Sequence, residues 1–278
     1  MRVGLVIDGT DQFFRPIEAE LRARHEVVRF KPSFVRLPLI GKRVNDWRLR
    51  RQLLSFTARN DVTFFEWATS LLAIATALPK RGRIAVRLHF HEIFETAANV
   101  DWSKVDALVL LTQYQREQLA PILADRVPVH LVRNGVNTDR FAPSERQFGY
   151  RIGMACSLLP RKRVYEAVLA LSELRAAGYP YTLRIAGTGG DYWEAKAYHR
   201  ALLDRVRELG LEEAVTFDGR VEDVAGWLAD VDVFLSNSSS EGLQVALLEA
   251  MSAGCYCLSH CWCGVEEVLP PEQIFVTE

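Results

Sequence analysis

The sequence predicts an α/β protein with two Rossmann-like domains, each built on a parallel sheet, and three observations lead to this prediction. Short apolar segments alternate with helical segments along the chain, which is typical of parallel strands covered by helices on both faces. This alternation restarts at Ile152. Between the halves, residues 134–150 are rich in Gly, Pro, Asn and Asp and have no clean period. We therefore predict one domain over residues 1–143 and a second over residues 144–278.

The composition is that of an ordinary globular protein. The chain has 278 residues, of which 49% are hydrophobic, and a formal net charge of −1, so it is long enough for two domains of typical size. No apolar run approaches the roughly 20 residues of a transmembrane helix. The segment from Met1 to Asp8 has the pattern of a strand and a turn rather than of a signal peptide. We therefore expect a cytoplasmic protein.

Strands and helices of the first half follow from its apolar periodicity. Strands are predicted where short apolar runs are rich in β-branched and aromatic residues: Val3–Asp8, Val27–Phe30, Val62–Phe65, Ile84–Leu88, Ala107–Leu111 and Val129–Val132. Helices are predicted where apolar residues recur at helical spacing: Ile17–Arg24, Trp47–Ala58, Ala68–Leu78 and Tyr114–Leu123.

The second half repeats the same alternation. Its predicted strands are Ile152–Ala155, Thr182–Ala186, Val215–Phe217, Val231–Leu235, Tyr256–Ser259 and Ile274–Val276. Its predicted helices are Val164–Ala176, Trp193–Leu209, Asp223–Leu228 and Leu243–Ala253, the last of which stops at Gly254.

The loop and helix from Ser236 to Glu249 form the main candidate for a ligand site. Small polar residues follow a predicted buried strand, and Glu241-Gly242 precedes the helix. Such a loop presents free backbone N–H groups to an anion. On these residues alone, two interpretations stand side by side. Either a ligand binds here, or Glu241 only complements the helix dipole and Glu249 is a solvated acid.

The order Glu241-Gly242 … Glu249, followed by Ala-Met-Ser-Ala-Gly254, resembles the E-x7-E signature of retaining family-4 glycosyltransferases, which have the two-domain GT-B fold. The stretch from Val132 to Pro143 also resembles the interdomain segment of that family. The resemblance covers nearly the whole second half. It implies that the two sheets face a central cleft where ligands bind. In that family one or two helices follow the last strand, so we expect the C-terminal helices to be missing after Glu278, either because the chain is truncated or because the fold is closed differently.

The resemblance implies that Lys162 binds the diphosphate of a nucleotide sugar. In the family's corresponding loop, an Arg and a later Lys hold this group, and here Ser157 stands at the Arg position. Arg161 or Arg163 could supply the missing charge, and the sequence does not decide between them. Without the resemblance, a solvated lysine at a helix start is the favoured interpretation.

Two further segments are similar to donor-binding parts of the family. The segment from Ile185 to Gly190 resembles its glycine loop, which makes Gly189 a candidate, although glycines here would by themselves indicate only a tight turn. Residues 217–221 resemble the segment whose backbone meets the nucleotide base, which makes Val221 a candidate.

Two histidines follow the predicted strand Ile84–Leu88. At the carboxyl end of a strand, beside Arg and Glu, they are as consistent with a functional role as with a structural one. The family has a His after this strand that reaches the donor sugar, and His89 fits its position better than His91. Gly9 resembles the glycine turn under the transferred sugar, with Thr10 in place of the usual second Gly.

No metal site is predicted. Four cysteines cluster near the C-terminus, but their spacing departs from that of usual zinc sites: Cys255, Cys257, Cys261 and Cys263. Cys255 and Cys257 fall on one face of a predicted buried strand, so packing is favoured over metal binding. The D-x-D spacing of Asp230 and Asp232 straddles a helix end and a buried strand. Family members generally need no metal, so the expected co-substrate is a nucleotide-diphosphate sugar, with no further cofactor.

Residues 29–52 hold eight Arg or Lys and one acid, interleaved with large apolar residues. A solvated basic face is the somewhat favoured interpretation. The alternative is a basic patch attracted to anionic lipid, and in the family this region often meets the acceptor. We hypothesise peripheral contact with the inner face of a membrane and a lipid-linked or membrane-proximal carbohydrate acceptor. Nothing in the sequence indicates a nucleic-acid partner.

These features predict a metal-independent, retaining glycosyltransferase of the hexosyltransferase type, acting in glycan or cell-envelope biosynthesis. Lys162 and the N–H groups of Gly242, Leu243 and Gln244 would stabilise the leaving diphosphate. Glu241 and His89 would hold the sugar, and Glu249 would bind the ribose diol. The prediction requires that neither acid is turned away from the groove or buried in a bridge to a neighbouring base.

A second class of function stays open. Ser157 and Thr10 depart from the family pattern, so the chain could be a catalytically degenerate nucleotide-sugar-binding or partner subunit with the GT-B fold. An epimerase or phosphorylase of that fold is disfavoured, because no pyridoxal-lysine site is recognisable. No motif identifies the donor base, the donor sugar, the acceptor or the oligomeric state.

Overall fold

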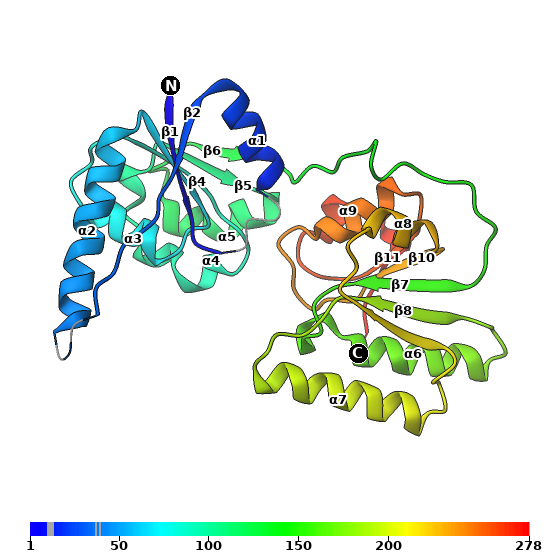
Figure 1. Cartoon of the computed structure of the whole chain (residues 1–278). Coiled ribbons are helices and arrows are strands. Elements are labelled where there is room, and N and C mark those ends of the chain that lie inside the picture. Colours follow the sequence, from blue (N-terminus) through cyan, green and yellow to red (C-terminus); the bar gives the residue numbers. More distant parts are fainter. Residues whose placement is uncertain (10–13, 37, 39, 278) are drawn as a thin grey trace. The chain divides into compact units, whose positions relative to one another are not determined.

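The computed structural model describes residues 1–9, 14–36, 38 and 40–277 (Figure 1). The chain divides into two compact units, Met1–Arg133 and Asn134–Glu278, which we call the N-terminal and the C-terminal unit. The division lies at the start of the turn-rich stretch 134–150, and the boundary predicted between residues 143 and 144 lies within the same stretch. Thr10 lies outside the described residues.

The N-terminal unit contains a six-stranded parallel sheet with the strand order β2-β1-β3-β4-β5-β6. Its strands are β1 (Arg2–Ile7), β2 (Glu26–Arg29), β3 (Val62–Glu66), β4 (Arg83–Arg87), β5 (Ala107–Leu110) and β6 (Val129–Leu131). Its helices are α1 (Arg15–Arg24), α2 (Gly41–Arg59), α3 (Ser70–Ala77), α4 (Glu92–Glu95) and α5 (Gln113–Leu123). Two 3₁₀ turns, Ala97–Asn99 and Trp102–Lys104, lie between α4 and β5.

The two faces of this sheet are covered by different elements, as the alternation of side chains along a strand requires. Val3 and Leu5 of β1 pack with Phe14 beside α1. Val6 points to the opposite face, into the larger core that includes residues of α3 and α5. Both faces of β1 are therefore apolar, which is why this strand is a continuous apolar run in the sequence.

The C-terminal unit contains a second six-stranded parallel sheet, with the order β12-β11-β10-β7-β8-β9. Its strands are β7 (Arg151–Ala155), β8 (Thr182–Ala186), β9 (Val215–Gly219), β10 (Val233–Ser236), β11 (Tyr256–His260) and β12 (Ile274–Phe275). Its helices are α6 (Val164–Ala176), α7 (Trp193–Glu208), α8 (Val224–Ala229) and α9 (Val245–Ser252). Three 3₁₀ turns are Pro160–Lys162, Val265–Glu267 and Pro271–Gln273.

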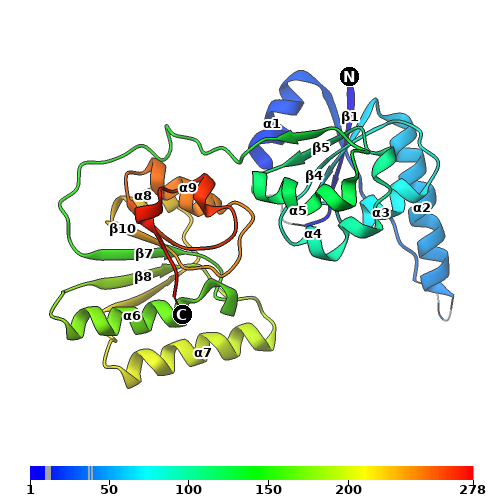
Figure 2. The same cartoon turned by 180° about the vertical axis from the view of Figure 1, so that it is seen from behind.

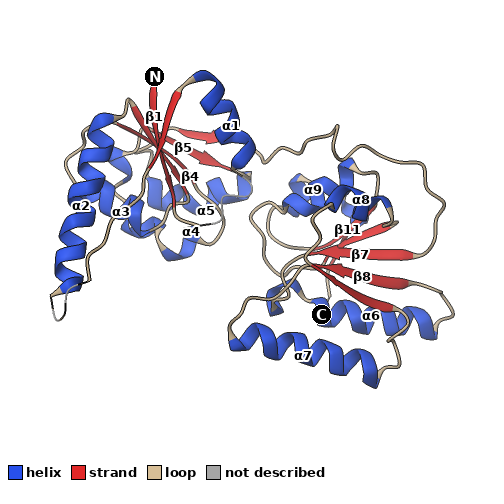
Figure 3. Ribbon diagram, viewed as in Figure 1, coloured by secondary structure: helices blue, strands red, loops and turns tan. Residues whose placement is uncertain are grey.

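Helices cover both faces of this second sheet. Figures 1 and 2 show α6 and α7 on one face and α8 and α9 on the other, and Figure 3 shows the same three layers coloured by secondary structure. On the α6 and α7 face, Val168 and Leu202 pack against Leu183 and Ile185 of β8. The prediction of two parallel α/β sheets is therefore confirmed.

The main differences from the predicted elements are at helix ends. α2 begins at Gly41 rather than Trp47, and α9 begins at Val245 rather than Leu243. The four-residue helix α4 was not predicted, because so short a segment has no measurable helical period. No helix within the described ranges is long and apolar enough to cross a membrane.

One glycine of the predicted glycine loop is required by its backbone. Gly187, directly after β8, has φ of 138°, and a Cβ at this position would lie 1.9 Å from the carbonyl oxygen of Cys156. Its N–H donates to the Gly219 carbonyl at 2.6 Å. Only glycine can therefore bring the ends of β7, β8 and β9 this close together.

Candidate functional site

Two loops of the C-terminal unit are joined at the carboxyl end of its sheet. β7 and β10 are neighbouring strands, and the segments that follow them meet. The N–H of Ser239 donates to the Arg161 carbonyl at 2.8 Å, and Nδ2 of Asn237 donates to the Arg163 carbonyl at 2.8 Å. Because these bonds tie one loop to the other, the side chains that the two loops carry have fixed positions relative to one another.

The joined loops bring Lys162 and Glu241 into a buried ion pair. The two side chains are 10% and 11% exposed, and Lys162 Nζ donates to Glu241 Oε1. Arg161 Nη1 lies 3.7 Å from the same oxygen and 3.3 Å from the Ser240 carbonyl, to which it donates. Three predicted site residues therefore converge: two cations around one carboxylate.

This pairing corrects one expectation. The sequence interpretation required that neither acid be buried in a bridge to a neighbouring base, and Glu241 is in such a bridge. The cause is the sheet order, which makes β7 and β10 neighbours. The partner, however, is itself the lysine that was predicted to bind the donor diphosphate.

The sequence did not decide between Arg161 and Arg163, and the structure places them in different environments. Arg163 has φ of 53°, and its guanidinium donates to Thr277 Oγ1 and lies 3.5 Å from Glu166. The Arg163 side chain thus lies near Thr277 and near Glu166 of α6, whereas the Arg161 side chain lies beside Glu241. Ser157 is exposed.

Glu249, the second acid of the E-x7-E spacing, is in a different environment. It lies on α9, is partly buried, and makes no side-chain hydrogen bond or ion pair with any residue that the structure describes. Burial raises the pKa of Glu249, and the distant positive charge of Arg140 offsets only part of this effect. A half-buried carboxylate without a partner is available to accept hydrogen bonds from a ligand.

Two residues between the two acids have buried side chains. Leu243 and Gln244 are buried, and Gln244 Oε1 accepts from the hydroxyl of Ser236. That hydroxyl also accepts from Trp262 Nε1 at 3.3 Å. Gln244 is the residue that caps α9, so the helix N-terminus begins one residue beyond the segment Gly242 to Gln244.

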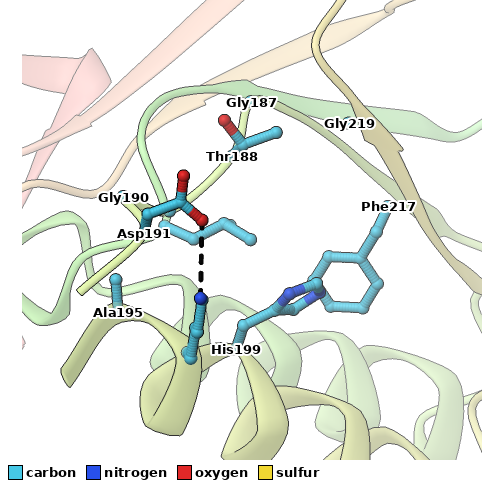
Figure 4. A pocket seen from close by; sticks show the side chains of 11 residues that line it. Gly187, Thr188, Gly190, Asp191, Ala195, His199, Phe217 and Gly219 are labelled. Carbon is cyan, nitrogen blue, oxygen red and sulfur yellow. Dashed lines mark ion pairs between the residues drawn. The ribbon is translucent and has the colours of Figure 1, made fainter. Parts of the chain in front are cut away.

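A cavity of about 270 Å³ opens beside the glycine loop, as Figure 4 shows. Gly187, Gly189 and Gly219 line it, and Val221 is not among its lining residues. A Cβ on Gly189 would lie 3.0 Å from the Cβ of Ala195, so the glycine allows α7 to approach the loop. Sequence reasoning missed two lining residues of α7, Lys196 and His199, because helix periodicity does not show which positions face a loop. Lys196 is ion-paired with Asp191 at 3.4 Å.

In the N-terminal unit, His89 belongs to a buried charged network. Glu66, at the end of β3, is 1% exposed and lies beside Arg87 of β4, which donates to it with Nε at 2.9 Å and with Nη2 at 2.5 Å. His89 Nε2 lies 3.0 Å from Glu66 Oε1. One carboxylate thus holds both an arginine and the predicted sugar-binding histidine. Sequence reasoning missed Glu66, although an acid directly after a predicted apolar strand was a visible signal.

Stacking and backbone bonds fix the same histidine from its other sides. The Trp67 indole stacks on the His89 ring with centroids 3.8 Å apart, and a Cβ on Gly9 would lie 3.0 Å from that indole. The N–H groups of His89 and Ala68 donate to Glu92 at 2.6 and 2.5 Å. Burial raises the pKa of Glu92. His91, by contrast, is exposed.

Residues of the D-x-D spacing and of the cysteine cluster, the two patterns that the sequence analysis considered as metal sites, have structural roles. Asp232 is buried and accepts from the Arg151 guanidinium at 2.9 and 3.0 Å and from the N–H groups of Gly149 and Arg151. Cys255 and Cys257 are buried, and burial raises the pKa of the Cys257 thiol to about 12. No three His, Cys, Asp or Glu side chains within the described ranges are grouped so that they could hold a metal ion.

The region that carries the ion pair is similar to known proteins. A family model described as Glycosyl transferases group 1 matches residues 149–277. The chain is 30% identical to the GDP-mannose-dependent alpha-(1-6)-phosphatidylinositol monomannoside mannosyltransferase of Mycobacterium tuberculosis, over 85% of this chain and 66% of that protein. The chain thus spans 66% of the length of this relative. It is 26% identical to the putative colanic acid biosynthesis glycosyltransferase WcaL of Escherichia coli, over 60% of this chain and 42% of that one.

Solved structures support the fold. Anabaena HepE, determined in complex with UDP, superposes with a TM-score of 0.76 at 17% identity and covers 100% of this chain and 85% of its own. The lipopolysaccharide outer core galactosyltransferase WaaB superposes with a TM-score of 0.70 at 17% identity, covering 99% and 86%. These likenesses confirm the predicted GT-B fold class of two parallel-sheet α/β domains.

The buried network around Glu66 gives a stability prediction. Glu66→Leu should lower the free energy of unfolding by about 3 to 5 kcal/mol, because the Arg87 guanidinium stays buried without this carboxylate. In the double variant Glu66→Leu/Arg87→Met no uncompensated charge remains, so much of the loss should be recovered. Chemical denaturation measures both values. Glu20→Ala, which removes an exposed pair with Arg24, is the control and should change little. A double variant as unstable as Glu66→Leu would contradict the network.

Proposed function

Since residues 149–277 are a Glycosyl transferases group 1 domain, we propose that this chain is a retaining glycosyltransferase that moves a sugar from a nucleotide-diphosphate sugar to an acceptor hydroxyl. The proposal rests on one observation above all. Arg161, Lys162 and Glu241 converge at the carboxyl end of the second sheet, which is where ligands of open α/β sheets bind.

In the proposed reaction, the cations of this cluster act on the leaving diphosphate. Departure of the nucleoside diphosphate concentrates negative charge on its outer oxygens, and Lys162 and Arg161 neutralise that charge. The Lys162 ammonium has three N–H donors and uses one for Glu241, so two remain for phosphate oxygens. The ion pair with Glu241 therefore holds Lys162 in place and leaves two of its N–H donors for the phosphate. These residues supply the positive charge, so no metal enters the proposed steps.

The sugar and the nucleoside are assigned to the carboxylates and to His89. Glu241 and His89 bind sugar hydroxyls while the ring acquires oxocarbenium character. Glu249, which has no partner within the described residues, binds the ribose diol. The acceptor oxygen forms a bond to the anomeric carbon on the face from which the phosphate oxygen leaves. The acceptor proton passes to that phosphate oxygen, so the configuration is retained without an enzymic nucleophile.

The relatives suggest which donor to test first. The Mycobacterium tuberculosis relative is described as GDP-mannose-dependent, and HepE was solved with UDP. We propose GDP-mannose as the donor, with UDP-glucose as the competing candidate. The acceptor is proposed to be a lipid-linked or cell-envelope carbohydrate. The catalytically degenerate binding subunit remains the second candidate, because Ser157 occupies the position of the expected Arg.

Membrane contact through residues 29–52 is part of the proposal. Large apolar side chains are exposed there, namely Phe34, Ile40 and Trp47, and they lie among basic residues. Apolar and polar residues are mixed around the circumference of α2 rather than gathered on separate faces. The contact is therefore assigned to the segment before α2 and to the start of that helix, rather than to one long amphipathic face.

The first test separates the roles of the two acids. Glu241→Ala should lower kcat for release of GDP from GDP-mannose by about 100-fold or more, because it removes a group that acts on the reacting sugar. Glu249→Ala should instead raise KM by about tenfold with little change in kcat. Glu173→Ala, an exposed acid on α6, is the control. Equal and small effects from Glu241→Ala and Glu249→Ala would contradict the roles proposed for the two acids. Thermal stabilisation by the donor without any GDP release would favour the binding subunit.

The raised pKa of Glu249 predicts a pH dependence. The carboxyl accepts hydrogen bonds from a diol only when ionised, and burial moves its pKa upward. Affinity for GDP should therefore fall as the pH decreases through this raised pKa, which lies above the usual value for a glutamate. Glu249→Gln should bind weakly at every pH and lose this dependence. Calorimetric titration from pH 5 to 8 measures it, and an unchanged slope in the Gln variant would assign the dependence to another group.

The membrane contact predicts salt-sensitive flotation. The chain should float with phosphatidylglycerol vesicles at low salt and dissociate as NaCl is added, because the basic residues are screened. Phe34→Ser/Trp47→Ser should reduce flotation about tenfold. The matched control Trp193→Ser/Tyr256→Ser removes exposed aromatics of the C-terminal unit and should leave flotation unchanged. Absence of salt-sensitive flotation by the wild-type chain would refute the contact.

A further inference from the structure

A basic groove lies beside the edge strand of the first sheet, and several of its residues belong to the basic segment 29–52. α2 packs over β1, because Gly4 has no side chain there: a Cβ on it would lie 2.5 Å from Asn60 and 2.6 Å from Phe56. With α2 held over β1, the face of the neighbouring edge strand β2 is left uncovered. The space between β2 and α2 is a cavity of about 480 Å³.

The inner surface of this groove is apolar and its wall is fixed. Val28, Phe30 and Phe56 line it, and the two Phe rings pack with centroids 5.2 Å apart. On the α2 side, Gln52 accepts from the Ser33 N–H at 2.8 Å and donates to the Ser33 carbonyl at 3.0 Å. These two bonds tie the segment after β2 to α2, so the groove is a built feature and not a gap between mobile side chains.

Every charged residue that lines the groove is basic. The five are Arg2, Arg29, Lys31, Arg51 and Arg59. The chain as a whole has 34 basic and 35 acidic residues, so the excess is local. A hollow lined by charges of one sign concentrates the electrostatic potential and attracts counter-charge.

Three of these cations have no carboxylate partner. Arg29 is bound by Glu18 of α1, and Arg2 lies 3.5 Å from Glu26. Lys31, Arg51 and Arg59 form no ion pair with any acid in the described part of the chain, and Arg51 instead lies over the Trp47 ring at 4.8 Å. The folded chain thus holds three unneutralised cations at one apolar hollow, and nearby like charges repel one another.

We propose that this groove binds a phosphate ester. The guanidinium groups of Arg51 and Arg59 can each bind two phosphate oxygens, and Lys31 supplies a third positive charge. The carbon skeleton of the ligand lies against Phe30 and Phe56. The volume of the groove is within the range of sites that hold small organic ligands. The ester is either a soluble phosphate or the headgroup of a phospholipid.

The site is independent of the proposed sugar transfer. All of its residues come from β1, β2, α2 and the segments next to them, and none belongs to the Glycosyl transferases group 1 domain. The site can therefore exist whether or not the transferase proposal is correct.

The test uses inorganic pyrophosphate as the probe. The chain carries Lys162→Met/Glu241→Leu in every sample, which weakens probe binding by the cluster in the C-terminal unit without leaving a buried charge unpaired. Arg51→Gln/Arg59→Gln should weaken binding at least tenfold by calorimetric titration. Arg43→Gln/Arg50→Gln is the matched control, because it removes the same charge from α2 at positions that do not line the groove, and it should change binding less than twofold. Arg51→Lys/Arg59→Lys should keep part of the affinity.

Two results would overturn the proposal: no saturable binding by the parent chain, or an equal loss in groove and control variants. Circular dichroism melting checks that each variant is folded. A second arm compares phosphatidylglycerol with phosphatidylcholine vesicles. Flotation with the anionic vesicles that is lost in the groove variant and competed by pyrophosphate assigns the ester to a lipid headgroup. Pyrophosphate binding without groove-dependent flotation assigns it to a soluble phosphate.

Discussion

The candidate site of the C-terminal unit depends on one buried ion pair, between Lys162 and Glu241. Both side chains are almost fully covered, so either charge alone would carry a desolvation penalty of several kcal/mol. Bonds from Ser239 and Asn237 to the opposite loop hold the backbone on both sides of the pair. These loops follow neighbouring strands, β7 and β10, so the parallel order of the sheet is what brings the two charges into contact.

Most of the fold could be predicted, because its signals are local. The strand Thr182–Ala186 and the helix Val164–Ala176 have the predicted bounds, since apolar periodicity and flanking turns define them within a few residues. The prediction fails at some helix ends, where apolar periodicity does not decide the boundary. Gln244 was predicted to be helical, but its side chain bonds with Ser236 of β10 and the residue caps α9 instead. α2 extends to Gly41, through basic residues whose pattern has no apolar period.

The site could be predicted only in part, for the same reason. Motif resemblance identified Lys162 and Glu241 separately, but they are 79 positions apart, and nothing local shows that they pair. Glu66 was missed because its importance comes from its strand neighbour: the register that sets it opposite Arg87 is a property of the sheet. The sequence made Gly189 the candidate of the glycine loop, yet of these two glycines Gly187 is the one with a positive φ. Spacing thus indicated which residues to consider, and the sheet order determined their partners.

Burial acts differently on the two acids of the E-x7-E spacing, although they are close in the chain. Glu241 is paired with Lys162 and lies 3.7 Å from Arg161, so two cations surround its carboxylate before any ligand binds. Glu249 is desolvated without such compensation, and its raised pKa is the consequence. A compensated carboxylate is suited to holding a cationic cluster and a sugar in a fixed geometry, whereas an uncompensated one gains most when a ligand donates hydrogen bonds to it. The environments that the fold gives these two acids, more than their identical chemistry, are the physical basis for assigning one to the reacting sugar and the other to affinity.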